Sequence, residues 1–222
     1  MTRKSALTFV LAISCLTALA APASALNWGG EVFGAFSTHS MKEWNDRVIV
    51  PAQQGGTDID EFSTGFGGGL GLRAWPNSNW MVSASWEPLF VSRETNSGSA
   101  AKIDLNANAF EATAGYFFPS SSQVKFGLGA GLGFYSLNGE VTSDGSPDVK
   151  LEGSTVGFHL HGLMEYLVSP GFAITGNAGY RFADIKDTKL DNQSVSPDEL
   201  STDYSGLALR AGVAFYLPRA GQ

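Results

Sequence analysis

Residues 124–135 read VKFGLGAGLGFY, and this stretch decides the fold class. Every second residue is apolar, and glycine fills most of the positions between. The apolar positions are Val124, Phe126, Leu128, Ala130, Leu132 and Phe134. A period of two puts these side chains on one face of a β-strand, whereas a helix would spread them around its axis. The four glycines also disfavour a helix. The stretch therefore predicts a strand with one apolar face and one narrow face.

The same alternation recurs along the chain, interrupted by turn residues. We expect eight strands, at 28–39, 61–75, 79–92, 102–118, 123–137, 151–168, 171–184 and 204–217. Each is long enough for the roughly 9–11 residues that a tilted membrane-spanning strand needs. The alternation at 102–118 changes phase near Ala109 and Phe110. A β-bulge, or a strand end that rises out of the bilayer, is expected there.

The connections between these strands are of two kinds. Short turns at 76–78, 119–122 and 169–171 alternate with long polar segments at about 40–60, 93–101, 138–150 and 185–203. Short turns on one rim and long loops on the other are typical of outer membrane barrels, with both termini on the short-turn side. The sequence thus predicts an all-β fold, an eight-stranded antiparallel up-and-down transmembrane β-barrel with periplasmic N- and C-termini.

The N-terminal segment has the features of an export signal. Arg3 and Lys4 precede an apolar run, and Ala23-Ser24-Ala25 fits a signal peptidase site. We expect a cleaved signal peptide at 1–25, the barrel at 26–217 and a short C-terminal tail at 218–222. The sole cysteine, Cys15, lies in the signal, so the barrel is expected to have no thiol chemistry. The chain has 14 basic residues, counting the two in the signal, and 21 acidic ones, which argues against a nucleic-acid partner.

Alternation alone does not say which face points outward. A lipid-facing charge near the bilayer midplane costs about 2–4 kcal/mol, so we assign the apolar face to lipid and the charges to the lumen. The predicted lumen polar network consists of Glu31, Arg73, Glu87, Glu111, His159, His161, Glu165, Arg181 and Arg210. Glu87 and Arg181, and Glu111 and Arg210, fall at similar heights on opposite strands, and we expect each pair to meet across the lumen. Buried charges must be paired, and eight strands leave room for little besides side chains.

Two patterns bear on chemistry. His159, His161 and Glu165 share one strand face, and a metal or acid–base site is an alternative to a hydrogen-bonded filling of the lumen, which we favour. The glycines at 127–133 are spaced by two and do not form a phosphate-binding G-x-G-x-x-G turn. The sequence therefore predicts no catalytic residue, no cofactor and no metal site.

Aromatic residues gather near the short-turn ends of the strands. They are Trp28, Trp75, Trp80, Phe117, Phe118, Tyr166, Phe172 and Tyr216. Amphipathic rings favour the headgroup zone, so these residues predict an aromatic girdle.

The C-terminal strand carries a pattern that barrel-assembly machinery reads. Arg210, Gly212, Phe215 and Leu217 fit polar-x-Gly-x-x-aromatic-x-apolar, although residues 218–222 follow it. With the alternation, the chain resembles the outer membrane protein β-barrel family, which includes the OmpA transmembrane domain, OmpX and OmpW. The resemblance covers about 26–217. It implies a location in the outer membrane and contact with barrel-assembly machinery, but it does not imply one activity.

Two of the long loops stand out. Ser40 to Glu43 has capping-box form, and Met41, Trp44 and Val48 share one helical face. We expect a short helix that ends before Pro51 and packs on the barrel rim; binding of a partner or of lipopolysaccharide is the alternative. The loop at 185–203 and its flanks are acidic, through Asp184, Asp187, Asp191, Asp198, Glu199 and Asp203. Divalent cation binding is the alternative there to a solvated loop.

Three functions remain open at this level. The first is an integral outer membrane protein, not an enzyme, with a structural or surface-interaction role through its outer loops. The second is a narrow channel or a passage for small apolar solutes, which OmpW-like barrels suggest. The third is a lipid A-modifying enzyme that would require His159 or His161. Outer membrane lipids and lipopolysaccharide are expected partners; the sequence identifies no surface ligand.

Overall fold

A computed structural model describes residues 27–95, 101–120, 123–143, 147–186, 188–191, 193–194 and 201–217. The predicted signal peptide at 1–25 and the tail at 218–222 lie outside these residues, as do Asp187, Asp198 and Glu199 of the acidic loop.

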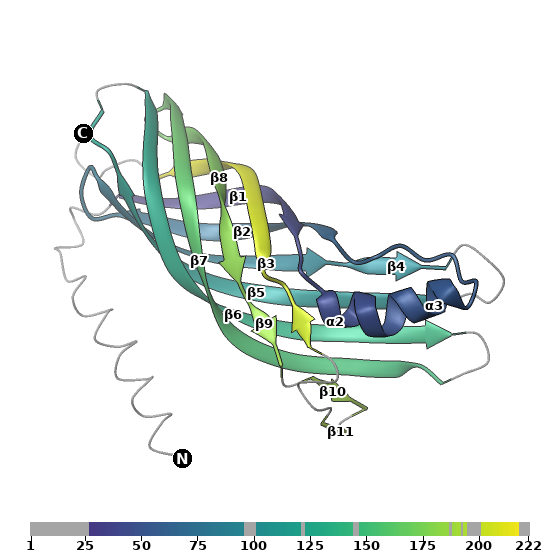
Figure 1. The fold of residues 1–222 in the computed structure, drawn as a ribbon. Helices are drawn as coiled ribbons and strands as arrows, with labels where there is room; N and C mark the ends of the chain where they lie inside the picture. The colour runs from purple at the N-terminus through teal and green to yellow at the C-terminus, as the bar shows by residue number, and fades with distance from the viewer. Residues whose placement is uncertain are drawn as a thin grey trace, which may run out of the picture.

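Eight long strands form a closed antiparallel barrel (Figure 1). They are β1 (Asn27–Thr38), β2 (Thr64–Trp75), β3 (Trp80–Phe90), β5 (Ala101–Phe117), β6 (Val124–Ser143), β7 (Val149–Ser169), β8 (Phe172–Phe182) and β13 (Gly206–Tyr216). Each strand pairs with the next along the chain, and β13 closes the barrel by pairing with β1 from Gly29–Tyr216 to Ser37–Ala208. The predicted eight-stranded up-and-down barrel is confirmed.

The barrel wall is apolar outside and polar inside. Leu72, Leu128 and Leu132 are each more than 60 % exposed, whereas Arg73, Glu111 and His159 are buried. Because these residues alternate along their strands, the exposed row faces away from the barrel axis. The large outward band of Phe, Leu and Val side chains suits hydrocarbon, which supports the chosen assignment of the faces.

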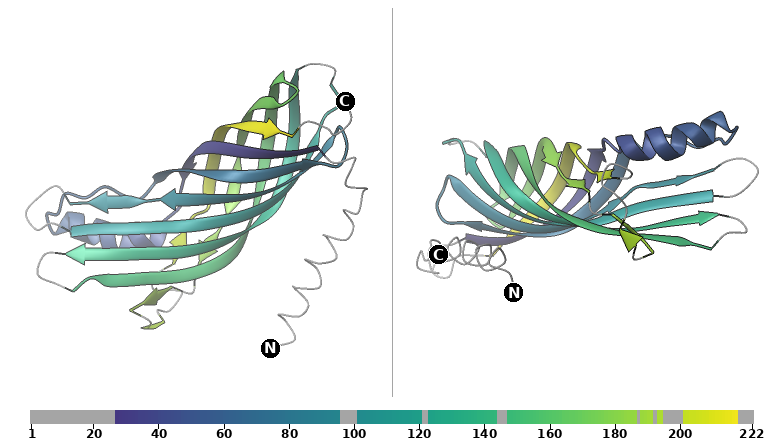
Figure 2. Two further views of the ribbon diagram at one scale, coloured as in Figure 1. Left: turned by 180° about the vertical axis from the view of Figure 1, so that it is seen from behind. Right: turned by 60° about the horizontal axis from the view of Figure 1, so that its bottom comes forward.

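The longest strands, β5, β6 and β7, continue beyond the barrel at the long-loop end (Figure 2). There the polarity of the two faces reverses. Leu105, Leu137 and Leu151 point inward and are fully buried, while Asn138 and Glu152 are exposed on the outer face. We call this part, residues 101–109 of β5, 135–143 of β6 and 149–155 of β7, the extension.

Of the two alternatives expected near Ala109 and Phe110, a bulge or a strand end rising out of the bilayer, the bulge is absent. β5 pairs with β6 without interruption from Ala101–Ser143 to Phe117–Gly127. The change of phase in the sequence comes from the reversal of polarity. Up to Ala109, on the long-loop side, the apolar side chains of β5 face inward; from Phe110 the alternating apolar row faces outward. The extension also makes β6 and β7 longer than expected, so that most of the predicted loop at 138–150 is strand.

A single helical run lies against the inner face of the extension (Figure 1). It consists of α2 (Lys42–Trp44), the π-helical turn η2 (Asn45–Ile49) and α3 (Val50–Gln54). The predicted capping box is not formed, because Met41 caps the helix with a left-handed backbone, φ 36°, and no side-chain hydrogen bond.

The helix also continues past Pro51, contrary to the prediction. The N–H of Val50 donates to the carbonyl of Asn45, five residues back. This wider turn accommodates the proline, which has no N–H to donate. The structure, as far as it is described, has no helix long and apolar enough to cross a membrane.

Several short strands lie at the long-loop end. β4 (Ser92–Glu94) continues the pairing of β5, while β10 (Lys189–Leu190) pairs with β7 and with β11 (Gln193–Ser194). β9 (Asp184–Ile185) pairs with β12 (Thr202–Asp203). Part of the predicted polar loop at 185–203 is therefore ordered by backbone pairing.

Two apolar clusters fill the interior at the two ends. The upper cluster, at the long-loop end, includes Met41, Trp44, Ile49, Phe62, Leu105, Leu137, Leu151 and Tyr204. The lower cluster, at the short-turn end, consists of Trp75, Met81, Phe117, Leu163, Ala173, Ala214 and Tyr216. The polar lumen lies between them.

Candidate functional site

The predicted lumen residues all point into the barrel. Seven are buried: Arg73, Glu87, Glu111, His159, His161, Glu165 and Arg181. The side chains of Glu31 and Arg210 are only 11 % and 7 % exposed. They form two layers, a middle layer around Arg210 and a lower layer around Arg73.

The middle layer is centred on Arg210, from β13. Its guanidinium contacts the carboxylates of both Glu87 and Glu111. Arg181 Nη2 lies 3.4 Å from Glu87 Oε1, and the Tyr135 hydroxyl donates to Glu111 Oε1 at 2.9 Å. Both expected pairs therefore meet across the lumen. The bridging of two glutamates by Arg210 was not expected from the sequence.

The lower layer is centred on Arg73, from β2. Arg73 Nη1 lies 3.1 Å from Glu165 Oε2 and 3.8 Å from Glu31 Oε1. Hydroxyl groups complete it: Tyr216 donates to Glu165 at 2.6 Å, and Thr175 donates to Glu31 at 2.6 Å. Sequence reasoning considered charged residues alone and missed these hydroxyls, although their inward register could have identified them.

His159, His161 and Glu165 share the inward face of β7, as expected, but the two histidines lie beside Glu111 and Glu165 lies in the other layer. His159 Nδ1 lies 3.9 Å from Glu111 Oε1, and the two imidazole rings are 4.6 Å apart. Glu165 follows His161 by four residues, which in a strand separates them by roughly 13 Å. That spacing places Glu165 in the lower layer beside Arg73.

The predicted aromatic girdle is partly corrected. Trp28, Trp80, Phe118 and Tyr166 are exposed on the outer face near the short-turn end, and Phe172 is half-buried.

Trp75, Phe117 and Tyr216 instead point inward and are buried. Trp75 packs on Phe117 with ring centroids 4.8 Å apart, and its Nε1 donates to the Tyr216 hydroxyl at 3.3 Å. Their strand positions explain this, since Trp75 is two residues from Arg73 and Tyr216 six from Arg210. These rings pack together inside the barrel at the short-turn end.

The remaining predicted residues lie as follows. Met41 and Trp44 of the loop-one helix are buried in the upper cluster, and Val48 packs against it half-buried. Trp44 Nε1 donates to Thr202 Oγ1 at 3.0 Å, which ties the helix to β12. In the C-terminal pattern, Phe215 and Leu217 are exposed on the outer face. Gly212 lies against Phe33, where a Cβ would be 2.8 Å from the Phe33 Cβ.

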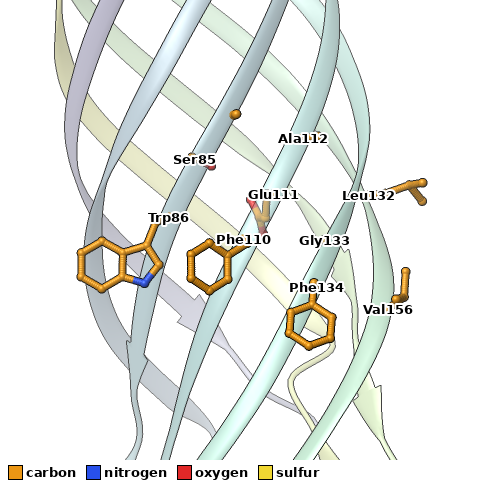
Figure 3. A pocket seen from close by; sticks show the side chains of 10 residues that line it. Ser85, Trp86, Phe110, Glu111, Ala112, Leu132, Gly133, Phe134 and Val156 are labelled. Carbon is orange, nitrogen blue, oxygen red and sulfur yellow. The ribbon is translucent and has the colours of Figure 1, made fainter. Parts of the chain in front are cut away.

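The outer wall carries an apolar groove of about 480 Å³ over β3, β5, β6 and β7 (Figure 3). Trp86, Phe110 and Phe134 form one side of it, and the small side chain of Ala112 leaves space beside these rings. Ala84 also lines the groove. Glu111 and Gly133, which face the lumen, contribute to its floor. The groove and the middle layer thus share one stretch of barrel wall.

Family comparison agrees with this architecture. The sequence matches the outer membrane protein beta-barrel domain family over residues 8–215. The chain belongs to that family. As an outer membrane β-barrel, it is assigned to the outer membrane. No curated protein matches its sequence.

Solved structures align with this chain at low sequence identity. A major outer membrane protein from Thermus thermophilus aligns with a TM-score of 0.60 and 14 % identity, over 87 % of this chain and 100 % of that one. Neisserial surface protein A aligns with a TM-score of 0.48 and 18 % identity, over 86 % and 96 % of the two chains. OprG from Pseudomonas aeruginosa gives 0.47 and 14 %, over 86 % and 94 %. At 14 % identity, the likeness to the Thermus thermophilus protein concerns the fold alone.

Proposed function

We propose that this outer membrane β-barrel is a closed scaffold that presents a rigid surface for contacts at its long-loop end. One observation carries the proposal: the interior is filled at successive levels by the upper cluster, the two polar layers and the lower cluster. In this proposal the long-loop end faces the cell exterior and both termini face the periplasm.

The polar layers oppose ion passage. A permeating ion would have to separate Arg210 from Glu87 and Glu111, and breaking a buried ion pair costs about 3–5 kcal/mol. The same ion would meet the buried rings of Trp75, Phe117 and Tyr216 at the short-turn end. In the upper cluster, the polar groups of Trp44 and Tyr204 are already hydrogen-bonded within the protein, so they do not replace the ion's hydration shell.

The extension supplies the contact surface. Its outer face carries a ladder of polar side chains, in which Asp104 pairs with Glu140 and Glu140 with Lys150 across neighbouring strands. Asn138 and Glu152 lie opposite each other in the next rung. Such a face suits the sugars of lipopolysaccharide or a protein at the cell surface. Contact with barrel-assembly machinery through Phe215 and Leu217 belongs to the same proposal.

Conductance of the refolded protein in a planar bilayer tests the closed scaffold. The unsubstituted protein is expected to give no steady current over a range of voltages. The informative variant is Gly129→Val, which fills the lumen, since a Cβ at Gly129 would lie 3.1 Å from Leu163 Cδ1. Leu132→Val, on the outer face of the same strand, is its matched control. A steady current that Gly129→Val removes and Leu132→Val keeps would refute the closed scaffold.

A second candidate, a lateral passage for small apolar solutes, is favoured by the groove in the outer wall. Ala112→Phe would fill this groove from the lipid side. If the protein provides such a passage, uptake of an apolar solute into vesicles should fall with Ala112→Phe and stay unchanged with Ala114→Phe, one pleat away on the same face. Lipid A modification gains no support, because His159 and His161 are buried in the lumen, away from the outer wall.

A further inference from the structure

Three buried side chains in the middle of the lumen bring together donor atoms suited to a metal ion. One carboxylate oxygen of Glu111 and one nitrogen each of His159 and His161 lie within 4.8 Å of one another. Glu111 comes from β5 and both histidines from β7. The chain has three histidines, so two of them are in this cluster.

The strand between Glu111 and the two histidines, β6, leaves room for their side chains to approach one another. β6 lies between β5 and β7, and it offers glycines at this level: Gly131 pairs with both Thr113 and His159, and Gly129 pairs with His161. A Cβ at Gly131 would collide with the His159 ring. Because Gly129 and Gly131 of β6 have no side chains, residues of β5 and β7 can reach each other inside the barrel.

The hydrogen bonds leave the cluster incomplete. His159 Nε2 lies 2.9 Å from Thr113 Oγ1, which leaves Nδ1 directed toward Glu111. His159 Nδ1 and both nitrogens of His161 find no hydrogen-bond partner within the described part of the chain. His161 is only 5 % exposed. A buried polar atom without a partner costs about 1–3 kcal/mol, so these three nitrogens would gain from binding a ligand.

A small cavity lies beside one member of the cluster. Its volume is about 20 Å³, the room that one water or ion occupies, and His161, Thr113, Arg73 and Arg210 border it, whereas Glu111 and His159 do not. In the middle layer two glutamates face two arginines, and the lower layer has two glutamates around Arg73. With neutral histidines these predicted lumen residues carry one more negative than positive charge.

We propose that Glu111, His159 and His161 bind one divalent transition-metal ion, of which Zn²⁺ fits the donor set best. Two imidazoles and a carboxylate are the ligands of many three-residue zinc sites. Thr113 would orient His159 through Nε2, the ring nitrogen that does not face the ion, as hydrogen-bond partners of zinc-binding histidines commonly do. The ion would link β5 to β7 across β6 and act as an internal brace.

The experiment measures the metal content of protein refolded into lipid, in tag-free form so that no added histidines interfere. After refolding with Zn²⁺ and extensive dialysis, mass spectrometry should find one zinc per chain. His159→Gln and His161→Gln should each weaken zinc binding at least tenfold in titration calorimetry. Thr113→Val should weaken it between about 10- and 100-fold. His39→Gln, which changes the remaining histidine outside the cluster, should bind like the unsubstituted protein.

Two results would overturn the proposal. One is the absence of bound zinc in folded, unsubstituted protein. The other is equal retention of zinc by His39→Gln and His161→Gln, which would show adventitious binding elsewhere. Should the histidine variants fail to fold, Co²⁺ bound to the unsubstituted protein still decides. Visible absorption bands of four-coordinate cobalt with nitrogen ligands support the site, and their absence in folded protein contradicts it.

Discussion

At the scale of single residues, Arg210 contacts two carboxylates and an aromatic ring in the lumen. Its guanidinium joins Glu87 to Glu111 and lies 5.0 Å from the centre of the Phe33 ring. Arg181 lies similarly over Tyr135, at 5.8 Å. Each arginine therefore neutralises a carboxylate on one side and packs on an aromatic ring on the other, an arrangement that lysine would not reproduce.

Arg210→Met tests this role. The substitution keeps most of the apolar stem but leaves Glu87 and Glu111 buried with a single arginine, so the barrel should lose about 3–5 kcal/mol of stability. Urea unfolding in lipid vesicles measures the loss. Lys150→Met, at an exposed position of the extension, should cost little. If Arg210→Met is as stable as Lys150→Met, the ion pairs do not carry stability.

His39, just beyond the end of β1, gives a residue-scale prediction about pH. Burial, with the nearby charge of Arg181, lowers the pKa of His39 from 6.5 to about 4. Above pH 6.5 the ring is neutral in the folded and unfolded chains alike. As the pH falls below 6.5, only the unfolded chain takes up the proton, so stability declines until about pH 4. The decline due to this group should be about 3 kcal/mol.

Unfolding curves of the original chain and of His39→Gln between pH 7.5 and pH 4 measure that decline. The stability of the original chain relative to His39→Gln should fall toward low pH, because only the original chain contains His39. Contributions from His159 and His161 are common to both chains and cancel in the difference. A difference that stays constant over this interval would contradict the assignment.

At the scale of elements, β6 shows both polarities along one strand. Leu132 and Asn138 project from the same outer face, three pleats apart. Leu132 is 63 % exposed within the apolar band, while Asn138 is exposed among the polar residues of the extension. The level between them, near Phe134, marks the upper edge of the apolar band.

A pair of lysine substitutions locates this edge. Leu132→Lys should cost about 2–4 kcal/mol, since it places a charge on the lipid face of the barrel. Asn138→Lys should cost less than about 0.5 kcal/mol, as exposed surface substitutions usually do. Both are measured by unfolding in the same lipid vesicles. Equal costs would mean that the two positions share one environment.

The sequence indicated the strands well because alternation is a local signal. All eight barrel strands lie where the pattern placed them, and the inward register of Glu87, Arg181 and Arg210 followed from it. Alternation does not tell how far a strand continues once its apolar face turns inward, so the lengths of β6 and β7 were underestimated. The grouping of His161 with Glu111 depends on the register between strands, which no single strand encodes. Trp75, Phe117 and Tyr216 were misplaced because their residue type outweighed their position.

At the scale of the whole molecule, the proposed direction of insertion is testable at the two ends of the barrel. Thr142, near the end of β6, and Ser78, in the turn between β2 and β3, are exposed at opposite ends of the barrel. The sole natural cysteine, Cys15, lies in the predicted signal peptide, so a cysteine introduced at either position would be a unique label on the barrel.

We expect Thr142→Cys to react with a membrane-impermeant maleimide on intact cells. Ser78→Cys should react only after the outer membrane is permeabilised. Labelling of the unsubstituted protein gives the background from Cys15. The opposite pattern of reactivity would place both termini outside the cell.

The extension has a consequence for recognition. A ligand that meets a long mobile loop must order it, and each immobilised side chain costs about 0.5–1.5 kcal/mol. Here the strands are paired, and the helical run is fastened beneath them by Trp44 and Asn45, whose amide group exchanges two hydrogen bonds with the backbone of Phe62. Ordering has thus taken place during folding. A partner that fits this face would find it preorganised, and selection could change affinity by replacing single outward side chains without rebuilding a loop.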